Sequence, residues 1–354
     1  MANPSLLILA GDGIGPEVMA EVVKVVGWFD ANGMAFEVER DLVGGCAFDA
    51  HGQAISDATM DRAMAADAVL LGAVGGPKWD RVPYEVRPEA GLLRLRKDLE
   101  LFANLRPAKC FDALADFSSL KRELVEGLDI LIVRELTGGL YFGAKGERED
   151  GTWFDTCEYT RPEVERIARR AFELARAAGR RLTSVDKVNV LHTSRLWRDV
   201  VVELGATEFP DVPLDHALVD SFAMTIVQAP ETIEVVVTEN TFGDILSDVA
   251  AAVTGGLGLA ASASLGDAGP GLFEPVHGSA PQLAGRGAAN PAAMLRSTAL
   301  LLRHGLGLVA EADALELAVD AALAAGPTPD LGGTATTREL GDAVLRGLER
   351  SPTL

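Results

Sequence analysis

Short apolar runs alternate with amphipathic stretches along the first third of the chain. Residues 5–10 form an apolar run of strand length, and a Gly-rich turn leads from it into a periodic stretch that predicts a helix from about Pro16 to Gly33. Residues 35–40 alternate as a strand does, and residues 68–74 predict a parallel strand buried on both faces. This rhythm of strand, helix and strand predicts an α/β protein.

The middle of the chain continues the pattern. It predicts, in chain order, a helix over 92–100, an extended segment over 102–110, a strand over 129–136, a helix over 161–178, strands over 185–191 and 232–240, and a helix over 241–253. Thr160 is the expected cap and Gly179 the expected end of the fourth of these elements, and Thr241 is the expected cap of the last. The remaining Gly- and Ala-rich segment is predicted to form helices and loops.

Length and composition narrow the kind of protein to expect. A chain of 354 residues is long enough for two packed α/β domains. A net charge of −20 argues against binding to nucleic acid or to an anionic membrane surface, because like charges repel. Cys46, Cys110 and Cys157 lack metal-site spacing and predict free thiols, and the N-terminus lacks the basic region of a signal peptide. These features predict a cytoplasmic protein.

Two aspartates in the predicted helix 241–253 are candidate metal ligands. Asp244 and Asp248 are four residues apart, so both carboxylates project from one helix face, where they repel each other. A bound cation removes that repulsion, and oxygen ligands favour Mg²⁺ or Mn²⁺. Neighbouring apolar residues predict that much of this helix is buried, where unpaired carboxylates are costly. Two solvated acids beside a helix cap are the alternative interpretation.

Four arginines lie on three consecutive predicted elements and suit an anionic ligand. Arg106 and Arg134 follow or end apolar strands, where α/β sheets tend to bind ligands. Arg94 and Arg96 cannot share a helix face, so we expect Arg94 at the surface and Arg96 in the pocket. Because planar guanidinium groups match carboxylates, the set predicts a carboxylate ligand.

Lys187 and Tyr141 are candidates for proton transfer. Lys187 lies within or at the edge of the predicted strand 185–191, where partial burial near cations favours the neutral amine that a general base needs. Tyr141 follows a Gly-Gly turn and can donate a proton. A structural salt bridge and a tyrosine at the edge of the core are the alternative roles.

Two glycine-rich segments are candidates for ligand binding. Residues 11–17, GDGIGPE, do not match the Rossmann dinucleotide pattern, because a proline interrupts it and the third glycine comes one position early. This segment can still approach a ligand through its backbone, or serve only as a tight turn. Residues 277–291 form a Gly/Ala/Ser loop with His277 and Asn290 as polar anchors, which suits a planar ligand.

Several segments, in order across nearly the whole chain, together resemble the β-decarboxylating dehydrogenases. They are GDGIGPEV, GLLRLRK, NLRP, VRELTGGLYFG, DKVNVL, SRLWR, VTENTFGDILSD and HGSAPQLAGRGAANP. Single motifs are shared with isocitrate, homoisocitrate and tartrate dehydrogenases. GLLRLRK, preceded by Glu89, resembles the isopropylmalate dehydrogenases of this family in particular.

The resemblance implies an architecture that the pattern alone does not give. It implies a non-Rossmann α/β fold of the isocitrate/isopropylmalate dehydrogenase type, with two domains and a mixed sheet. Residues 1–101 plus 256–354 would form the first domain, on the cofactor side, and residues 102–255 the second, with the dimer interface and the metal and catalytic residues. The implied homodimer shares its active sites, so that Lys187 and Asp220 serve the second copy and a monomer is inactive.

The same resemblance implies a reaction and a set of site residues. The expected reaction is the oxidative decarboxylation of 3-isopropylmalate to 4-methyl-2-oxopentanoate and CO₂ with reduction of NAD, in leucine biosynthesis. A related enzyme acting on tartrate, D-malate, isocitrate or another alkylmalate is the alternative. The implied substrate residues are Glu89, Leu92, Leu93, Arg96, Arg106, Arg134 and Asp220. The implied ligands of Mg²⁺ or Mn²⁺ are Asp220, Asp244 and Asp248. The implied NAD residues are Ile14, His277, Gly278, Ser279, Ala280, Gln282 and Asn290.

The resemblance also implies how the catalytic residues divide the work. Lys187 would accept the hydroxyl proton, through Asp220 or a water, as hydride passes to NAD. Tyr141 would then protonate the enolate that the loss of CO₂ leaves. Leu92 and Leu93 would offer an apolar surface to the isopropyl group. Lys187, Asp220 and Tyr141 are therefore the expected catalytic residues.

One residue departs from the pattern of these enzymes. They have an aspartate for the adenosine ribose after HGSAP, and this chain has Gln282. Glutamine can hydrogen-bond a ribose hydroxyl but repels a 2′-phosphate less than aspartate does. Asp330 adds an acid nearby. The sequence therefore favours NAD, with weaker discrimination against NADP.

Restoring the aspartate tests this interpretation. We expect Gln282→Asp to sharpen the preference for NAD over NADP, because the new carboxylate repels a 2′-phosphate. The measurement is the ratio of kcat/KM with NAD to kcat/KM with NADP in both proteins. An unchanged ratio would mean that residue 282 does not discriminate between the cofactors.

Overall fold

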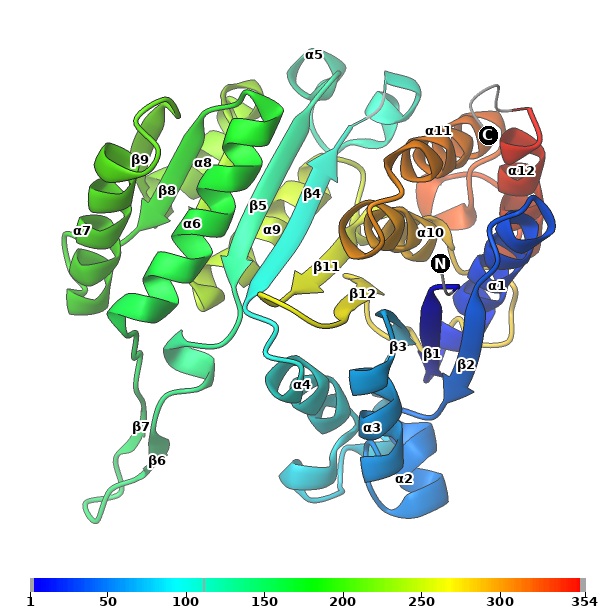
Figure 1. Ribbon diagram of the computed structural model, residues 1–354, viewed down its shortest axis with the longest axis horizontal. Coiled ribbons are helices and arrows are strands. Elements are labelled where there is room, and N and C mark those ends of the chain that lie inside the picture. The colour runs from blue at the N-terminus through cyan, green and yellow to red at the C-terminus, as the bar shows by residue number, and fades with distance from the viewer. Residues whose placement is uncertain (1–2, 111, 351–354) are drawn as a thin grey trace. The chain divides into compact units, whose positions relative to one another are not determined.

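The computed structural model describes residues 3–110 and 112–350, and the chain divides into two compact units (Figure 1). The first unit consists of Met1–Leu101 and Gly255–Leu354, and the second is Phe102–Thr254. Both units combine helices with a sheet, so the predicted α/β class is confirmed. The roles expected of the two parts, cofactor binding and dimer formation, remain predictions.

The first unit contains five strands in the order β2-β1-β3-β12-β11. They are β1 Ser5–Gly11, β2 Glu37–Asp41, β3 Ala68–Ala73, β11 Ala261–Leu265 and β12 Gly271–Pro275. β1 pairs in parallel with β2 and β3, β3 pairs in parallel with β12, and β11 runs antiparallel to β12. Every residue of β3 is buried, as its unbroken apolar run predicts.

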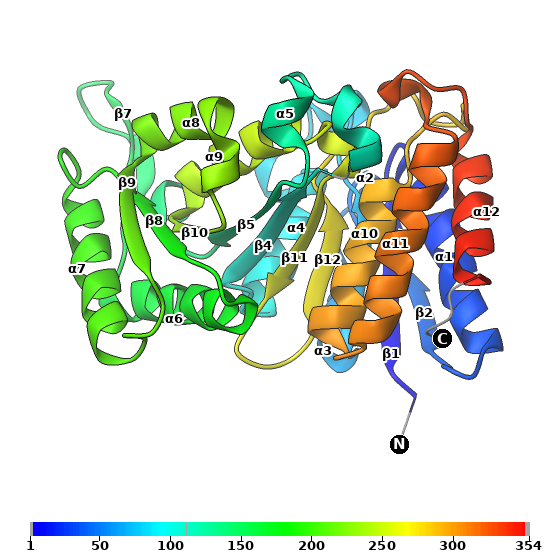
Figure 2. The same cartoon turned by 90° about the horizontal axis from the view of Figure 1, so that it is seen from above.

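The first unit also contains helices, some against the sheet and others packed on those helices. They are α1 Gly15–Ala31, α2 Gly45–His51, α3 Asp57–Ala65, α4 Pro88–Asp98, α10 Ala292–Leu300, α11 Val309–Ala325 and α12 Thr337–Leu348. Figure 2 shows α10 and α11 side by side, and α12 contacts both α11 and α1. Every residue of α10 is buried, because this helix contacts β11 and β12 as well as α1 and α11.

The second unit contains five strands in the order β4-β5-β10-β8-β9. They are β4 Ala103–Lys109, β5 Asp129–Glu135, β8 Leu182–Asp186, β9 Leu214–Leu218 and β10 Val235–Thr238. β4 runs antiparallel to β5, and the other neighbours are parallel. A separate hairpin is formed by β6 Lys145–Glu147 and β7 Trp153–Asp155.

The helices of the second unit are α5 Arg122–Val125, α6 Arg161–Ala178, α7 His192–Thr207, α8 Val219–Gln228 and α9 Asn240–Val253. The predicted boundaries of α6 are confirmed. Thr160 and Glu163 form a capping box at its start, and Gly179 ends it with a φ of +65°. No helix in the described part of either unit is long and apolar enough to cross a membrane.

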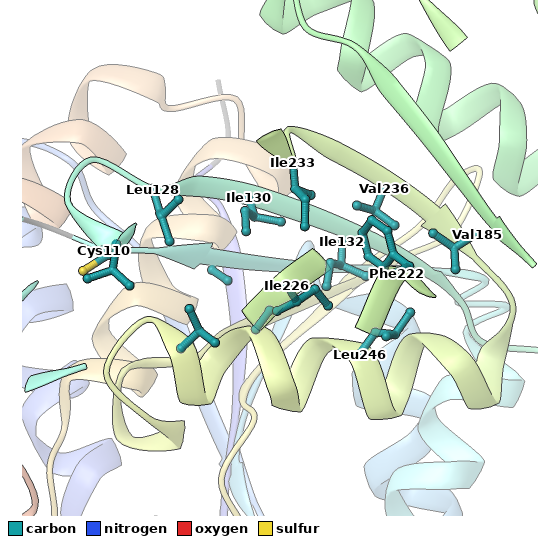
Figure 3. Close-up of a cluster of buried hydrophobic side chains, with 14 of the residues drawn as sticks. Cys110, Leu128, Ile130, Ile132, Val185, Phe222, Ile226, Ile233, Val236 and Leu246 are labelled. Carbon is teal, nitrogen blue, oxygen red and sulfur yellow. The ribbon is translucent and has the colours of Figure 1, made fainter. Parts of the chain in front are cut away.

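A buried apolar cluster fixes α9 against the sheet of the second unit (Figure 3). Ile132 of β5 and Val236 of β10 belong to this cluster together with Leu246 of α9. Phe222 and Ile226 add the apolar face of α8. α9 also contacts β4. The packing therefore holds the helix with the candidate metal ligands against the strands that carry two of the candidate arginines.

Two predicted boundaries are wrong because local hydrogen bonds outweigh the apolar pattern. The strand predicted over 185–191 ends at Asp186, and residues 187–191 form a turn in which two backbone N–H groups donate to the carbonyl of Lys187. Val190 consequently lies 66% exposed. The helix predicted from Thr241 begins at Asn240 and is capped by Glu239, whose carboxylate accepts from the N–H groups of the next turn.

Two further expectations are corrected. The Gly- and Ala-rich C-terminal third contains two strands, β11 and β12, in addition to the helices and loops predicted for it. β11 consists mostly of Ala and Ser and β12 is short, and both strands contact each other and the buried α10. Much of α9 is buried, as predicted, but Ile245, one of the apolar residues on which that prediction rested, is 59% exposed.

Candidate active site

Asp244 and Asp248 lie one turn apart on α9 and share a guanidinium group. Arg106 of β4 places Nη2 3.6 Å from Asp244 Oδ1 and Nη1 3.3 Å from Asp248 Oδ1. Arg134 of β5 also donates to Asp244 Oδ1. The repulsion between the two carboxylates is therefore offset by two guanidinium groups.

Neutral acceptors hold the two arginines in place. Arg134 is only 3% exposed, and its Nε and Nη2 donate to Asn240 Oδ1 at 3.1 and 2.8 Å. Arg106 donates from Nε to Asn104 Oδ1 at 2.8 Å and from Nη1 to Ser247 Oγ at 3.0 Å. Since buried charges require such partners, these contacts keep both side chains in one orientation.

A glycine allows Arg134 to pass close to α9. A Cβ atom at Gly243 would lie 2.6 Å from Arg134 Cγ and 2.8 Å from Arg134 Cβ. Real side chains do not approach so closely. The glycine of the FGD segment is therefore required by the position of the arginine.

Tyr141 lies at the end of the 3₁₀ turn Gly139–Tyr141 and points to the same carboxylate. Its hydroxyl donates to Asp244 Oδ2 at 3.1 Å. Burial and the nearby Asp244 carboxylate raise the pKa of Tyr141. The phenol therefore stays protonated at neutral pH and can act as a proton donor.

The buried side chain of Glu135 binds the backbone of Thr137 and Gly138, just before Tyr141. This fully buried carboxylate accepts from the N–H and hydroxyl of Thr137 at 2.8 and 2.6 Å and from the N–H of Gly138 at 2.8 Å. Burial raises the pKa of Glu135, while these hydrogen bonds favour its ionised form. The turn is thus fixed by backbone contacts independent of any ligand.

Burial affects Asp248 as well. It raises the pKa of Asp248, and the neighbouring Asp244 carboxylate adds to the effect, while Arg106 opposes it. A divalent cation would favour the ionised form of the same carboxylate. The oxygen-only donor pair is chemically suited to Mg²⁺ or Mn²⁺.

Lys187 and Asp220 form a second group. The Lys187 Nζ lies 2.5 Å from Asp220 Oδ1, and this hydrogen bond lowers the pKa of Asp220. Within residues 3–110 and 112–350, no three His, Cys, Asp or Glu side chains gather as a metal site requires. Asp220 therefore does not join Asp244 and Asp248 within one chain.

In the first unit, the structure distinguishes the two arginines of α4. Arg94 pairs with Asp57 and Asp98 at the surface. Arg96 is largely buried and donates to Glu274 Oε1 at 2.8 Å, and its Nε has no hydrogen-bond partner among the described residues. The guanidinium of Arg96 therefore keeps one donor available.

The three other candidate substrate residues of α4 differ in their surroundings. Glu89 is exposed near the start of the helix. Leu92 packs partly against the apolar core of the first unit, whereas Leu93 is 39% exposed. Adjacent helical residues point about 100° apart, so the two leucines do not share one face.

The two glycine-rich segments of the first unit meet. The Ile14 N–H donates to the Ser279 carbonyl at 2.8 Å, and a Cβ at Gly13 would lie 2.0 Å from that oxygen. The Glu17 carboxylate accepts from the N–H groups of Gly285 and Gly287. The turn after β1 thus fastens the loop 277–291.

The polar anchors of this loop have distinct partners. Asn290 donates to Asp330 Oδ2 at 3.1 Å and accepts from the Ala292 N–H at 2.9 Å. Burial lowers the pKa of His277, and its Nε2 is buried with no partner in the part of the chain that the structure describes. Gln282 is exposed, as is Gly278, while Ser279 is buried and Ala280 adopts a φ of +37°.

Sequence reasoning missed the residues that hold these groups. Two of them accept hydrogen bonds from candidate arginines, namely Asn240 and Glu274. The other two accept from backbone N–H groups, namely Glu135 and Glu17. All except Glu274 stand in or beside the motifs used for the family resemblance. The sequence signal that could have identified these supporting residues is a polar residue at the point where a buried strand meets a turn or a helix.

Replacing Gly243 tests the close approach of Arg134 to α9. We expect Gly243→Ala to lower the free energy of unfolding by about 1–3 kcal/mol, because the new methyl group displaces the arginine stem. The matched control is Gly27→Ala in α1, where no described atom other than the adjacent residues and the backbone of the helix itself lies within 4 Å of an added Cβ. That change should stabilise the protein by about 0.5–1 kcal/mol. Chemical denaturation measures both, and a stabilised Gly243→Ala protein would contradict the steric argument.

Comparisons with known proteins place this geometry in a family. The family model described as isocitrate/isopropylmalate dehydrogenase matches residues 5–344. The chain is 55% identical to the 3-isopropylmalate dehydrogenase of Ruegeria pomeroyi, over 99% of this chain and 100% of that protein. It is 52% identical to the 3-isopropylmalate dehydrogenase 2 of Bradyrhizobium diazoefficiens, over 99% of each chain.

Two solved structures of dehydrogenases have the same fold as this chain. The isocitrate dehydrogenase from Methylococcus capsulatus has a TM-score of 0.88 and 34% identity, covering 98% of this chain and 100% of that chain. The β-decarboxylating dehydrogenase from Thermococcus kodakarensis has a TM-score of 0.80 and 36% identity, covering 98% of this chain and 96% of that one. The fold that the resemblance implied is confirmed, and the chain belongs to the isocitrate/isopropylmalate dehydrogenase family.

Proposed function

We propose that this protein oxidises and decarboxylates 3-isopropylmalate to 4-methyl-2-oxopentanoate and CO₂, with NAD as hydride acceptor and Mg²⁺ or Mn²⁺ as metal. The carrying observation is a charge-balanced cluster of two guanidinium groups and two carboxylates beside a protonated phenol, formed by Arg106, Arg134, Asp244, Asp248 and Tyr141. A divalent cation and a dicarboxylate entering together preserve that balance. The high identity to 3-isopropylmalate dehydrogenases supports this substrate over isocitrate, tartrate or D-malate.

Asp244 and Asp248 would hold the divalent cation. Because two carboxylates leave most coordination positions open, we propose that Asp220 of a second copy adds a third ligand. A cation bound there supplies a Lewis acid for the loss of CO₂. The exposure of Asp220, whose side chain is 66% accessible, supports a role outside its own chain.

The protein's own residues then bind the substrate and move protons. Arg106 and Arg134 bind the substrate carboxylates. The Lys187 Nζ and Asp220 Oδ1 lie 2.5 Å apart, close enough for a proton to pass between them. Once the ammonium form of Lys187 has released a proton to water, its amine accepts the proton of the substrate hydroxyl through Asp220. Tyr141 gives its proton to the enolate carbon, since its raised pKa keeps that proton available.

The loop 277–291 would bind the adenosine part of NAD. The pKa of His277 is lowered by burial, so the ring is neutral at pH 7. Its Nδ1 lies 3.0 Å from the Gly278 carbonyl, an acceptor, so Nδ1 carries the proton and Nε2 can accept a hydrogen bond from the adenine amino group. The exposed Gln282 is free to reach a ribose hydroxyl.

We also propose a homodimer formed by the second unit. Large apolar side chains are exposed on α8, on α9 and on the β6–β7 hairpin, namely Met224, Val227, Ile245 and Trp153. Trp153 is 76% exposed. Exposure of this much apolar surface is typical of a protein interface. Such an interface would bring Lys187 and Asp220 of one copy to the aspartates of the other.

A substrate panel tests the proposed reaction. We expect 3-isopropylmalate with NAD and Mg²⁺ to give the highest kcat/KM among 3-isopropylmalate, isocitrate, tartrate and D-malate. EDTA should abolish turnover and Mn²⁺ should restore it, because the carboxylate pair needs a divalent cation. The measurements are NADH formation and CO₂ release. A higher kcat/KM with another acid would replace the proposed substrate, and no turnover with any acid would overturn the proposal.

Mixing two inactive variants tests the shared site. Lys187→Ala and Asp244→Asn should each be inactive alone, since one removes the proton acceptor and the other a metal ligand. A statistical mixture of their subunits should recover about a quarter of the wild-type rate, because half of the dimers then hold one intact site out of two. The rate is measured after joint unfolding and refolding, or after co-expression.

The control mixture combines Asp244→Asn with Tyr141→Phe, which would damage the same side of every site. It should recover no activity. Equal recovery in both mixtures, or in neither, would contradict an active site built from two copies.

A further inference from the structure

Asn240 contacts two parts of the active site that are distant in the chain. It is the first residue of α9 and only 1% exposed. Its side-chain oxygen accepts from Arg134 Nε and Nη2, at 3.1 and 2.8 Å, and its amide nitrogen donates to the Gly138 carbonyl at 3.1 Å. Gly138 begins the turn that ends at Tyr141. Asn240 therefore bridges a proposed substrate arginine and the turn of the proposed proton donor.

We propose that Asn240 is a positioning residue that couples the guanidinium of Arg134 to the turn carrying Tyr141. The inference rests on the proposed function and adds a residue to it. Arg134 and Tyr141 each contact Asp244, one at Oδ1 and the other at Oδ2. Asn240 joins the same two elements on the opposite side. The four residues and the short turn thus close a ring of contacts.

The amide group is the chemical requirement of this bridge. A guanidinium only donates and a carbonyl only accepts, so the bridging side chain must offer both an acceptor and a donor. Asparagine does so within one planar group, whereas aspartate offers acceptors only and alanine offers neither. The two partners also fix which end of the amide is oxygen.

The backbone of Asn240 is itself held in place. Its N–H donates to the Tyr159 hydroxyl at 3.0 Å, and that hydroxyl donates to Glu239 Oε2 at 3.3 Å. The Glu239 carboxylate in turn caps α9 through the N–H groups of Thr241 and Phe242. Because the backbone of Asn240 is fixed, its side chain determines the positions of both Arg134 and Gly138.

The turn on the far side of the bridge has little freedom of its own. A Cβ at Gly138 would lie 2.5 Å from the Tyr159 ring, and one at Gly139 would lie 2.6 Å from the Tyr159 hydroxyl. The two glycines thus rest directly on the residue that holds the backbone of Asn240. A small shift at Asn240 should therefore displace Tyr141 as well as Arg134.

A double-mutant cycle with Tyr141→Phe tests the coupling. We expect Asn240→Ala to lower kcat about 100-fold, because a misplacement of about 1 Å costs that much. The KM for the acid should rise about 10-fold as Arg134 loses an acceptor, and the KM for NAD should stay within about 2-fold. In the Tyr141→Phe background the same change should lower kcat less than about 3-fold. Equal losses of kcat in both backgrounds would overturn the proposal.

A control separates positioning from general loosening of α9. The Ser118 hydroxyl donates to the Val253 carbonyl at the other end of this helix, at 2.5 Å. Ser118→Ala should lower the Tm as Asn240→Ala does, with kcat and both KM values unchanged. If Ser118→Ala reproduces the kinetic losses, the role of Asn240 is only structural and the proposal fails.

A second variant covers the case in which Asn240→Ala does not fold. Asn240→Asp keeps an acceptor for Arg134 and removes the donor to Gly138, and it should lower kcat at least about 10-fold. Wild-type kcat in this variant would overturn the proposal.

The cycle is run with whichever acid the wild-type enzyme turns over best, so a wrong substrate leaves it intact. If no acid is turned over, crystal structures of wild type and a folded Asn240 variant decide. Displacement of both Arg134 and the Gly138 turn supports the coupling, and unchanged positions overturn it.

Discussion

A buried guanidinium group sets the requirement that the second unit has to meet. Arg134 is almost completely inaccessible and remains charged, so its donors must all find acceptors nearby. Asp244 and Asn240 provide them from α9. Both lie on a single helix, so that helix has to sit at a fixed height and rotation against β5. The apolar cluster of β5, β10, α8 and α9 provides that placement, and the lack of a side chain at Gly243 leaves room for Arg134 beside the helix.

Charge balance explains how the ionisable groups can gather in two clusters. Arg106 and Arg134 balance Asp244 and Asp248, and Lys187 balances Asp220. Each group is neutral as a whole before any ligand binds. A preformed, neutral arrangement of charges would have little reorganisation to undergo on binding the proposed substrate and metal, and such preorganisation is how active sites stabilise charge that develops during a reaction.

The sequence predicted most of the regular elements and indicated candidate chemical groups, because both leave local signals. The capping box and glycine that bound α6, the buried run of β3 and the i, i+4 spacing of Asp244 and Asp248 are such signals. The contacts that orient those groups depend on residues distant in the chain. Nothing local shows that Glu239 rather than Thr241 caps α9.

Tertiary context also decided the cases that pattern reasoning missed. β11 is made of small residues that suit a helix or a loop equally well, and β12 has only five residues. β12 pairs with β3, about 200 residues earlier in the chain, so no local pattern shows it as a strand of this sheet. Lys187 was expected in a strand because the segment around it is apolar, yet that segment turns at the surface. An apolar run predicts burial only where local hydrogen bonds do not fold the segment into a turn at the surface.

The order of the strands along the chain affects how the protein folds while the ribosome is still synthesising it. β3 pairs with β12, so Ala68 finds its partner at Gly271 only after the whole of Phe102–Thr254 has been made. The second unit is continuous and can fold as soon as it emerges. The first three strands must wait meanwhile with an apolar edge unpaired, and such edges promote aggregation. During synthesis the N-terminal segment, although made first, therefore keeps one strand edge unpaired until β12 has been made.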